Sequence, residues 1–261
     1  MVRISIREKG NTKVFGLRNR IVACAGIFFF LIVLGGGMTN PSEALSEKRD
    51  VVLLGASIGF YWKFEDLPKR MGMEGYTFEY IGEDGFDKSK TLQKILSRPN
   101  RPDAIFLKQC AAYFPGDLVQ YQALMKTYVQ ECLKAGIVPI LVTVAPVREP
   151  GIFKLQYWKN IVKKIIYPSR PTVEARLRDL TAYNDWLKKY SLEQNLEIVD
   201  LEKALRISDT DRRLRADFDG GDGLHLNSNA YAKLDQIVMP TLEKVDWNRF
   251  IRVRGQTSTI D

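Results

Sequence analysis

Residues 51–59 read VVLLGASIG, a short apolar and β-branched run that passes directly into a serine flanked by glycines, Ser57. Such a run predicts a buried strand. The glycines permit a tight turn from strand to helix, which would expose the serine side chain and its backbone N–H. This stretch therefore predicts a buried sheet whose first strand presents Ser57 at its carboxyl end.

Strands and helices are predicted to alternate along the rest of the chain. Three further buried strands are indicated, at 104–107 (AIFL), 137–144 (IVPILVTV) and 196–201 (LEIVDL). Apolar residues at helical spacing predict helices over 117–134, 172–190 and 228–244. Asp117 is the expected N-cap of the first helix, and Gly136 is its expected stop. This alternation predicts the α/β class, as a three-layer α/β/α sandwich with a mostly parallel sheet.

The overall charge does not indicate a nucleic-acid partner. The 261 residues carry a net charge of +8, and residues 1–44 hold six basic residues against two acidic ones, a net of +4. The remainder is therefore only mildly basic, at +4, and a nucleic-acid footprint gathers its charge more densely on one element. The chain as a whole has 45% apolar and 27% charged residues, the composition of an ordinary globular protein.

Residues 1–45 differ from the rest, because a basic stretch precedes a continuous apolar run at 21–34. The charge asymmetry directs such a run into a membrane with its basic end in the cytoplasm. It is either a short membrane anchor or a signal peptide cleaved near Ser42-Glu43-Ala44. Both alternatives place a domain over 46–261 outside the cytoplasm, in the periplasm or cell envelope, either secreted or anchored to the membrane.

The second chemical feature is the segment Asp222-Gly223-Leu224-His225, which precedes the predicted helix at 228. His225 is the only histidine in the chain. A serine hydroxyl becomes nucleophilic when an imidazole takes its proton, and the imidazole needs a carboxylate to hold its tautomer. Taken singly, each residue could be structural, but Ser57, His225 and Asp222 together supply every part needed for acyl transfer.

The order of these residues separates two families. G-x-S-x-G also fits the nucleophile elbow of α/β-hydrolases, but there several strands precede the serine and the acid lies well before the histidine. The chain instead resembles the SGNH/GDSL-type hydrolases over about residues 50–245. VVLLGASIG is similar to their first block, with Ala56 where aspartate is usual, and DGLHLNSNAYAKL is similar to their last block. The resemblance implies a flavodoxin-like sandwich and the triad Ser57, Asp222 and His225.

The same resemblance implies an oxyanion hole made by the nucleophile's N–H, a glycine N–H of a second block and an asparagine of a third. The second block is similar to YIGEDG at 80–85, which makes Gly85 the expected donor and Gly82 the alternative. After AIFL the chain reads KQCAAY and has no asparagine. Gln109 or Lys108 could replace it, or these residues could simply face solvent at the strand end.

Neither a metal nor a cofactor is expected. Cys110 and Cys132 could pair in an oxidising compartment, although two buried thiols are the simpler state, and no spacing resembles a zinc site. The connection at 145–178 is basic and aromatic. It could contact an anionic lipid or glycan, or form an amphipathic helix that packs Trp158 and Ile161 on the domain.

The sequence therefore predicts an exported serine esterase that works through an acyl-serine. Its expected partners are a small-molecule, lipid or glycan ester, such as an O-acetylated polysaccharide, and the membrane through the N-terminal segment. Two alternatives stay open. An O-acyltransferase would share the first half-reaction, and the missing asparagine is compatible with a catalytically weakened, membrane-tethered binding protein.

Overall fold

The computed structural model describes residues 48–151, 162, 166 and 171–249. The predicted N-terminal segment, 1–45, lies outside these residues, and so do Trp158 and Ile161 of the basic connection. Among the described helices, none combines the length and apolar character needed to cross a bilayer.

The described residues form a five-stranded sheet in the order β2-β1-β3-β4-β5, and every neighbouring pair is parallel. The strands are β1 (Arg49–Gly55), β2 (Tyr76–Gly82), β3 (Ala104–Lys108), β4 (Val138–Val142) and β5 (Ile198–Val199). This order is that of flavodoxin-like sheets, so the predicted fold class is confirmed. The direction of winding reverses between β1 and β3, where such folds open a crevice at the carboxyl ends of the strands.

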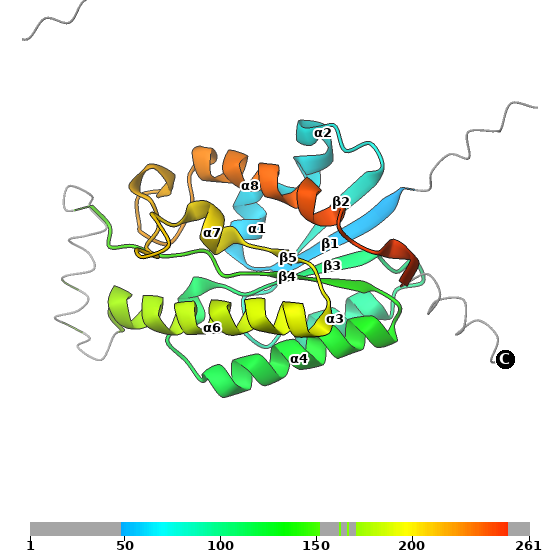
Figure 1. Ribbon diagram of the computed structural model, residues 1–261, viewed down its shortest axis with the longest axis horizontal. Coiled ribbons are helices and arrows are strands. Elements are labelled where there is room, and N and C mark those ends of the chain that lie inside the picture. The colour runs from blue at the N-terminus through cyan, green and yellow to red at the C-terminus, as the bar shows by residue number, and fades with distance from the viewer. Residues whose placement is uncertain (1–47, 152–161, 163–165, 167–170, 250–261) are drawn as a thin grey trace, which may run out of the picture. The chain divides into compact units, whose positions relative to one another are not determined.

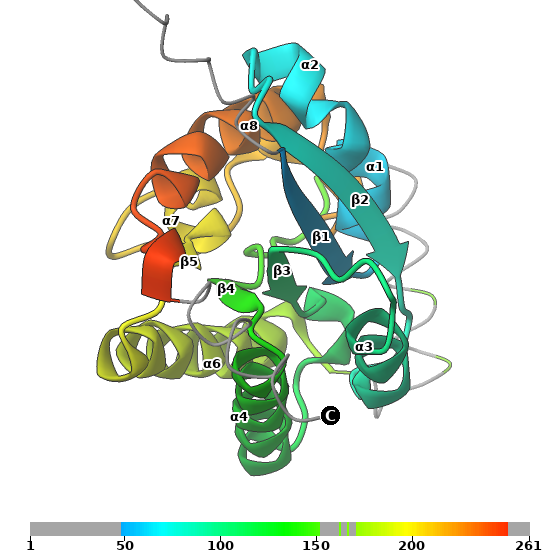
Figure 2. The ribbon, with the colours of Figure 1, turned by 90° about the vertical axis from the view of Figure 1, so that its right-hand side faces the viewer.

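Helices cover both faces of the sheet (Figures 1 and 2). One face carries α1 (Ser57–Trp62), α2 (Leu67–Met71), α7 (Leu201–Leu205) and α8 (Ser228–Leu242). The other carries α3 (Ser89–Leu96), α4 (Leu118–Lys134) and α6 (Val173–Gln194). Short 3-10 turns occur at Phe64–Asp66, Ala111–Tyr113 and Ala216–Phe218.

Two apolar cores result from the alternation of side chains along the strands. In β1, Val51 and Leu53 face α1 and α8, whereas Val52 and Leu54 face α3 and α4. All four are at most 2% exposed. A strand that is buried on both faces reads as a continuous apolar run, which is why 51–54 could be recognised in the sequence.

Two strands differ from the sequence expectation. β5 has two paired residues, whereas the apolar pattern indicated 196–201. The strand β2 was not predicted, because it lies at the sheet edge and alternates buried Phe78 with exposed Thr77 and Glu79.

The predicted N-cap of α4 is confirmed, since Asp117 accepts a hydrogen bond from the N–H of Gln120, 3.0 Å away. Cys110 and Cys132 are both buried and free, as expected.

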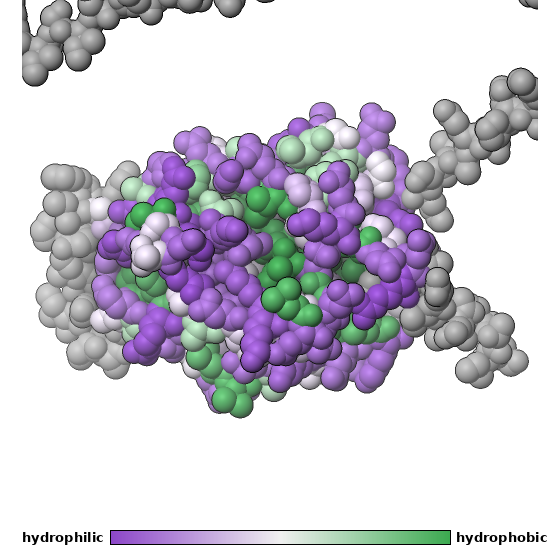
Figure 3. All heavy atoms as spheres, in the orientation of Figure 1, coloured by the Kyte–Doolittle hydropathy of each residue, from purple (hydrophilic) through white to green (hydrophobic). Residues whose placement is uncertain are grey.

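The face in Figure 3 is largely hydrophilic, with apolar groups exposed between α8 and α6, beside the short β5.

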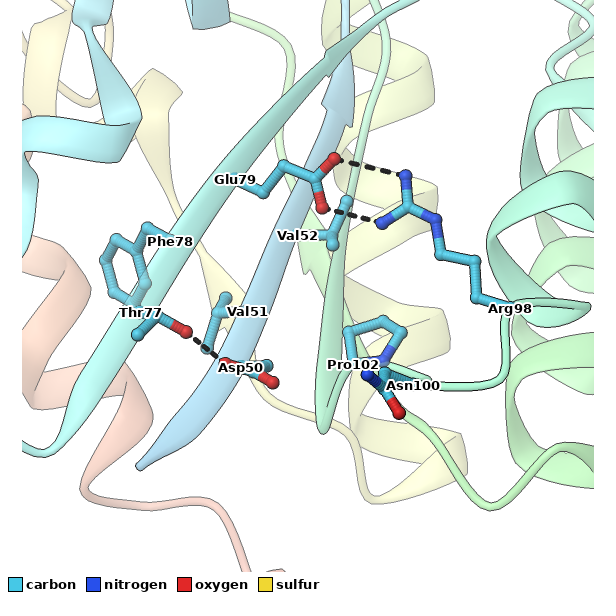
Figure 4. Close-up of a pocket in the computed structure, with 9 residues that line it drawn as sticks. All are labelled: Asp50, Val51, Val52, Thr77, Phe78, Glu79, Arg98, Asn100 and Pro102. Atoms are coloured by element: carbon cyan, nitrogen blue, oxygen red, sulfur yellow. Dashed lines mark hydrogen bonds and ion pairs between the residues drawn. The ribbon is translucent and has the colours of Figure 1, made fainter. Parts of the chain in front are cut away.

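A cavity of about 270 Å³ lies where β1 and β2 run past the chain that leaves α3 (Figure 4). It is lined by Asp50, Val51, Val52, Thr77, Phe78, Glu79, Arg98, Asn100 and Pro102. The strand residues among them come from the first four positions of β1 and β2, and the others from the chain between α3 and β3, so the cavity is remote from the carboxyl ends that carry Ser57.

Candidate active site

Ser57 is the first residue of α1 and follows the carboxyl end of β1 by two residues. The glycines beside it are required by close packing, and neither has a positive φ. A Cβ on Gly59 would lie 2.5 Å from Cε2 of Tyr80, and a Cβ on Gly55 would lie 3.3 Å from Cβ of Lys108. The G-x-S-x-G pattern thus lets β2 and β3 approach the serine loop closely.

Asp222, His225 and Ser57 form one chain of hydrogen bonds. Nδ1 of His225 lies 2.6 Å from Oδ2 of Asp222, and Nε2 lies 3.2 Å from Oγ of Ser57. The other carboxylate oxygen, Oδ1, accepts the backbone N–H groups of Leu224 and His225 at 2.9 and 2.8 Å. The Asp-x-x-His spacing therefore lets one carboxylate fix both the turn and the imidazole ring.

The protonation of Asp222 sets the direction of these bonds. Burial acts to raise its pKa, but the hydrogen bonds from the backbone and ring of His225 and from the backbone of Leu224 outweigh it, so the pKa lies below the ordinary value. An ionised carboxylate only accepts hydrogen bonds. Nδ1 of His225 therefore carries the proton, which leaves Nε2 to accept the hydroxyl proton of Ser57.

The loop that carries these residues is fixed from both sides. The carboxylate of Asp219 accepts the N–H groups of Gly221 and Gly223 at 2.8 and 2.9 Å. On the opposite side, the N–H of Arg148 donates to the carbonyl of Gly223 at 2.9 Å. Gly223 has φ = 78°, and a Cβ there would strike the carbonyl oxygen of Arg148. Glycine is therefore required one residue after the acid.

A buried network joins the serine helix to the helix that follows His225. Asp235 on α8 accepts the indole N–H of Trp62 on α1 at 2.7 Å. It also accepts Nε and Nη2 of Arg70 at 2.8 and 2.9 Å. Because α1 has only six residues, these contacts fix its position more than its own backbone hydrogen bonds do.

The expected oxyanion donors lie in different settings. Gly82 pairs with Gly55 at the end of the β1–β2 ladder. Gly85 follows in the loop before α3, and its N–H makes a long 3.4 Å hydrogen bond to Oε1 of Glu83. Gln109 is 1% exposed and donates from Nε2 to the carbonyl of Phe86 at 3.2 Å. Its amide nitrogen is thus engaged in holding that loop, while Oε1 has no partner among the described residues.

Two residues near this site, Lys88 and Tyr61, were not assigned by sequence reasoning, whereas Lys108 was named as a possible replacement for the missing asparagine. Lys88 and Lys108 are buried, at 2% and 1% exposure, close to the loops after β2 and β3. Tyr61 packs its ring edge-on against His225, with 5.7 Å between the ring centroids. The only signal for Lys108 was its position at the end of an apolar strand, which is more often a solvent-facing place.

Solved structures with the same architecture support the fold assignment. A GDSL-like lipase from Bacteroides thetaiotaomicron aligns with a TM-score of 0.56 and 15% identity, over 75% of this chain and 88% of that one. An acetylxylan esterase from Geobacillus stearothermophilus aligns with a TM-score of 0.53 and 14% identity, over 77% and 96%. No protein-family model matches the sequence, and no curated protein matches it. The described domain thus has the fold of GDSL- and SGNH-type hydrolases, as the sequence resemblance implied.

Proposed function

We propose that this protein is a serine ester hydrolase in which Ser57 is the nucleophile, His225 the general base and Asp222 the residue that orients the imidazole. The observation that carries the proposal is the hydrogen-bonded chain from Asp222 through His225 to Ser57, with distances of 2.6 and 3.2 Å. Ser57 begins α1 and His225 lies 168 positions later in the loop before α8, and an ionised carboxylate lies on the far side of the imidazole ring from the hydroxyl.

The chemistry follows from the tautomer in which Nδ1 of His225 carries the proton. Oγ of Ser57 attacks the ester carbonyl while its proton moves to Nε2 of His225, and the carbonyl oxygen takes up the negative charge. Collapse of this intermediate breaks the bond to the alcohol, which leaves with the proton from Nε2. Water then attacks the acyl-serine by the same route and releases the acid. Asp222 keeps its charge throughout and stabilises the imidazolium.

We further propose that the substrate is an O-acetylated glycan met outside the cytoplasm. Phe60 and Tyr61 follow the nucleophile by one helical turn and are 63% and 56% exposed, so both aromatic side chains are accessible to a sugar. Two neighbouring structures are acetylxylan esterases, which supports this class. Export rests on the basic and apolar pattern of residues 1–45.

A fluorophosphonate probe tests the nucleophile, since it reacts with activated serines. The wild type should be labelled, Ser57→Ala should not, and His225→Ala should be labelled at least about a hundredfold more slowly, because general-base catalysis contributes about 10²–10⁴-fold. Ser97→Ala is the matched control, because Ser97 is an exposed serine at the end of α3. Labelling that survives in folded Ser57→Ala protein contradicts the assignment, and a folded wild type that never reacts favours the binding-protein alternative.

The substrate class is tested separately. Acetate release from acetylated xylan should exceed hydrolysis of long-chain p-nitrophenyl esters, and Tyr61→Ala should raise KM for the glycan more than for p-nitrophenyl acetate. A preference for long acyl chains would contradict the glycan assignment and identify a lipid-like ester as the substrate. Transfer of acetyl to an added sugar alcohol, in place of release to water, would identify an acyltransferase.

A further inference from the structure

Lys108 is the last residue of β3 and stands at the point where the sheet reverses its winding. Alternation along the strand places it on the same face as Phe106, which is the face that carries α1 and α8. Its Cβ and Cδ run alongside Gly55, two residues before Ser57. The loop after β2 meets the same place, because the N–H of Glu83 donates to the carbonyl of Gly55 at 2.8 Å. Lys108 therefore lies where the loops after β1, β2 and β3 converge.

The ammonium of Lys108 lacks a counter-ion among the described residues. Only 1% of Lys108 is exposed, and Nζ donates one hydrogen bond, to the carbonyl of Gln109 at 3.1 Å. An ammonium has three hydrogens to donate. A buried charge is strongly unfavourable unless it is paired and hydrogen-bonded. Lys108 thus has donor capacity that the described protein groups leave unfilled.

A second buried ammonium strengthens the positive potential. Nζ of Lys88 donates to the carbonyls of Gly85 and, at 3.0 Å, Glu83, and lies 5.4 Å from the centre of the Tyr113 ring. No carboxylate forms an ion pair with either lysine in the part of the chain that the structure describes. The carboxylate of Glu83 is engaged elsewhere, by the hydroxyl of Thr91 at 2.5 Å. Lys108 thus has no carboxylate at ion-pair distance among the described residues, whereas Lys88 lies within the electrostatic influence of Glu83 and Asp84.

We propose that Lys108 is the oxyanion donor that takes the place of the missing asparagine, with its Nζ–H groups directed to the oxygen that becomes negative when Ser57 attacks. The inference rests on the proposed hydrolase function. Lys108 neither gains nor loses a proton in this step. It donates a hydrogen bond that strengthens as charge develops, while Gln109, the other candidate offered by the sequence, holds the Phe86 carbonyl instead.

Lys108→Met tests this role, because methionine keeps much of the stem and removes every N–H donor. With p-nitrophenyl acetate, a neutral ester, we expect kcat to fall about 10²–10³-fold, as for loss of one oxyanion donor elsewhere. KM should change less than about threefold, because an interaction made only in the transition state leaves ground-state binding intact. Lys108→Gln, which retains an N–H donor without charge, should keep more of kcat. Lys189→Met, on an exposed lysine with 77% of its side chain accessible, is the matched control.

Thermal unfolding separates this role from a structural one. A buried charge without a partner is unfavourable, so its replacement by an apolar side chain of similar length should not destabilise the fold. Lys108→Met should therefore unfold at the wild-type temperature or above while losing kcat. A fall in kcat matched by a fall in unfolding temperature, in both Lys108 variants, would assign Lys108 to the fold and overturn the inference.

Two further results would also overturn it. If Lys108→Met keeps the wild-type kcat, Lys108 is not the oxyanion donor. The hydrolase assignment still stands in that case if Ser57→Ala is inactive. A rise in KM confined to esters that carry a carboxylate, with kcat on the neutral ester unchanged, would mean that the lysine binds an anionic group of the substrate. Activity that persists in Ser57→Ala contradicts the proposed function itself.

Discussion

The contact between α1 and α8 offers a sharp test of how the nucleophile is positioned. Asp235 is 9% exposed in its side chain and receives three hydrogen bonds, one from Trp62 and two from Arg70. In Asp235→Asn the shape is kept and the charge is removed. An amide oxygen in the place of Oδ1 still accepts from Trp62 and from Nη2 of Arg70, whereas the amide N–H₂ group faces Nε of Arg70, which then has no acceptor.

The size of the effect follows from burial. Breaking a buried ion pair by removing one partner costs about 3–5 kcal/mol. Arg70 has a side chain that is 33% exposed, and asparagine retains one acceptor, so a lower value applies here. We expect the free energy of unfolding to fall by about 2–4 kcal/mol. Because α1 then loses its link to α8, kcat for ester hydrolysis should fall as well.

A second bidentate pair in the same protein provides the control. Arg98 donates to both carboxylate oxygens of Glu79, at 2.6 and 3.1 Å (Figure 4), and the two side chains are 37% and 47% exposed. The geometry resembles the Asp235 pair, but the solvent exposure differs. Glu79→Gln should therefore lower the free energy of unfolding by less than about 1 kcal/mol.

Urea unfolding followed by tryptophan fluorescence measures both variants, with ester hydrolysis measured in native buffer. Equal losses of stability in Asp235→Asn and Glu79→Gln would refute the burial reasoning. A destabilised Asp235→Asn protein with wild-type kcat at a temperature where it is fully folded would refute the claim that this network positions Ser57.

Two further predictions concern the loops of the site. Gly223→Ala combines a positive φ with a clash against the Arg148 carbonyl. It should therefore cost about 1–3 kcal/mol of stability and reduce kcat. Gly75→Ala, with no atom within 4 Å of its new Cβ, should be nearly neutral in the same unfolding and kinetic assays. Burial, aided by the charge of Lys108, lowers the pKa of Lys88 from 10.5 to about 8. Between these values the unfolded chain binds more protons than the native one, so this group makes the free energy of unfolding rise with pH above 8, by at most about 3 kcal/mol in total. Urea titrations from pH 7.5 to 10 should show a flatter rise in Lys88→Met, and equal slopes would contradict the assignment.

The parts of the site that the sequence predicted are those encoded by short-range patterns. A strand buried on both faces reads as an unbroken apolar run, so 51–54 indicated β1 and the location of Ser57. The i, i+3 spacing of Asp222 and His225 suffices for one carboxylate to bind both the backbone and the ring. The meeting of Ser57 with His225 required the additional premise that both loops lie at the carboxyl edge of one parallel sheet.

Lys108 shows what the sequence left open, because it was named both as a possible donor and as a residue that could simply face solvent. A polar residue after AIFL reads as the solvated end of a strand, yet the structure leaves it 1% exposed. The loops after β1 and β2 meet beside it, and no local pattern determines how such loops pack. The edge strand β2 was missed for a related reason, since one exposed face gives it the composition of a loop.

The same reasoning predicts where stability and catalysis are coupled. A helix of six residues is too short to be stable alone, so the place of Ser57 depends on contacts that come from elsewhere in the chain. Three reach this region, namely Asp235 from α8, the N–H of Glu83 from the loop after β2, and the stem of Lys108 from β3. Weakening the first should lower stability and kcat together, whereas removing the charge of Lys108 should lower kcat alone. That difference distinguishes a residue that holds the nucleophile from one that acts on the reacting oxygen.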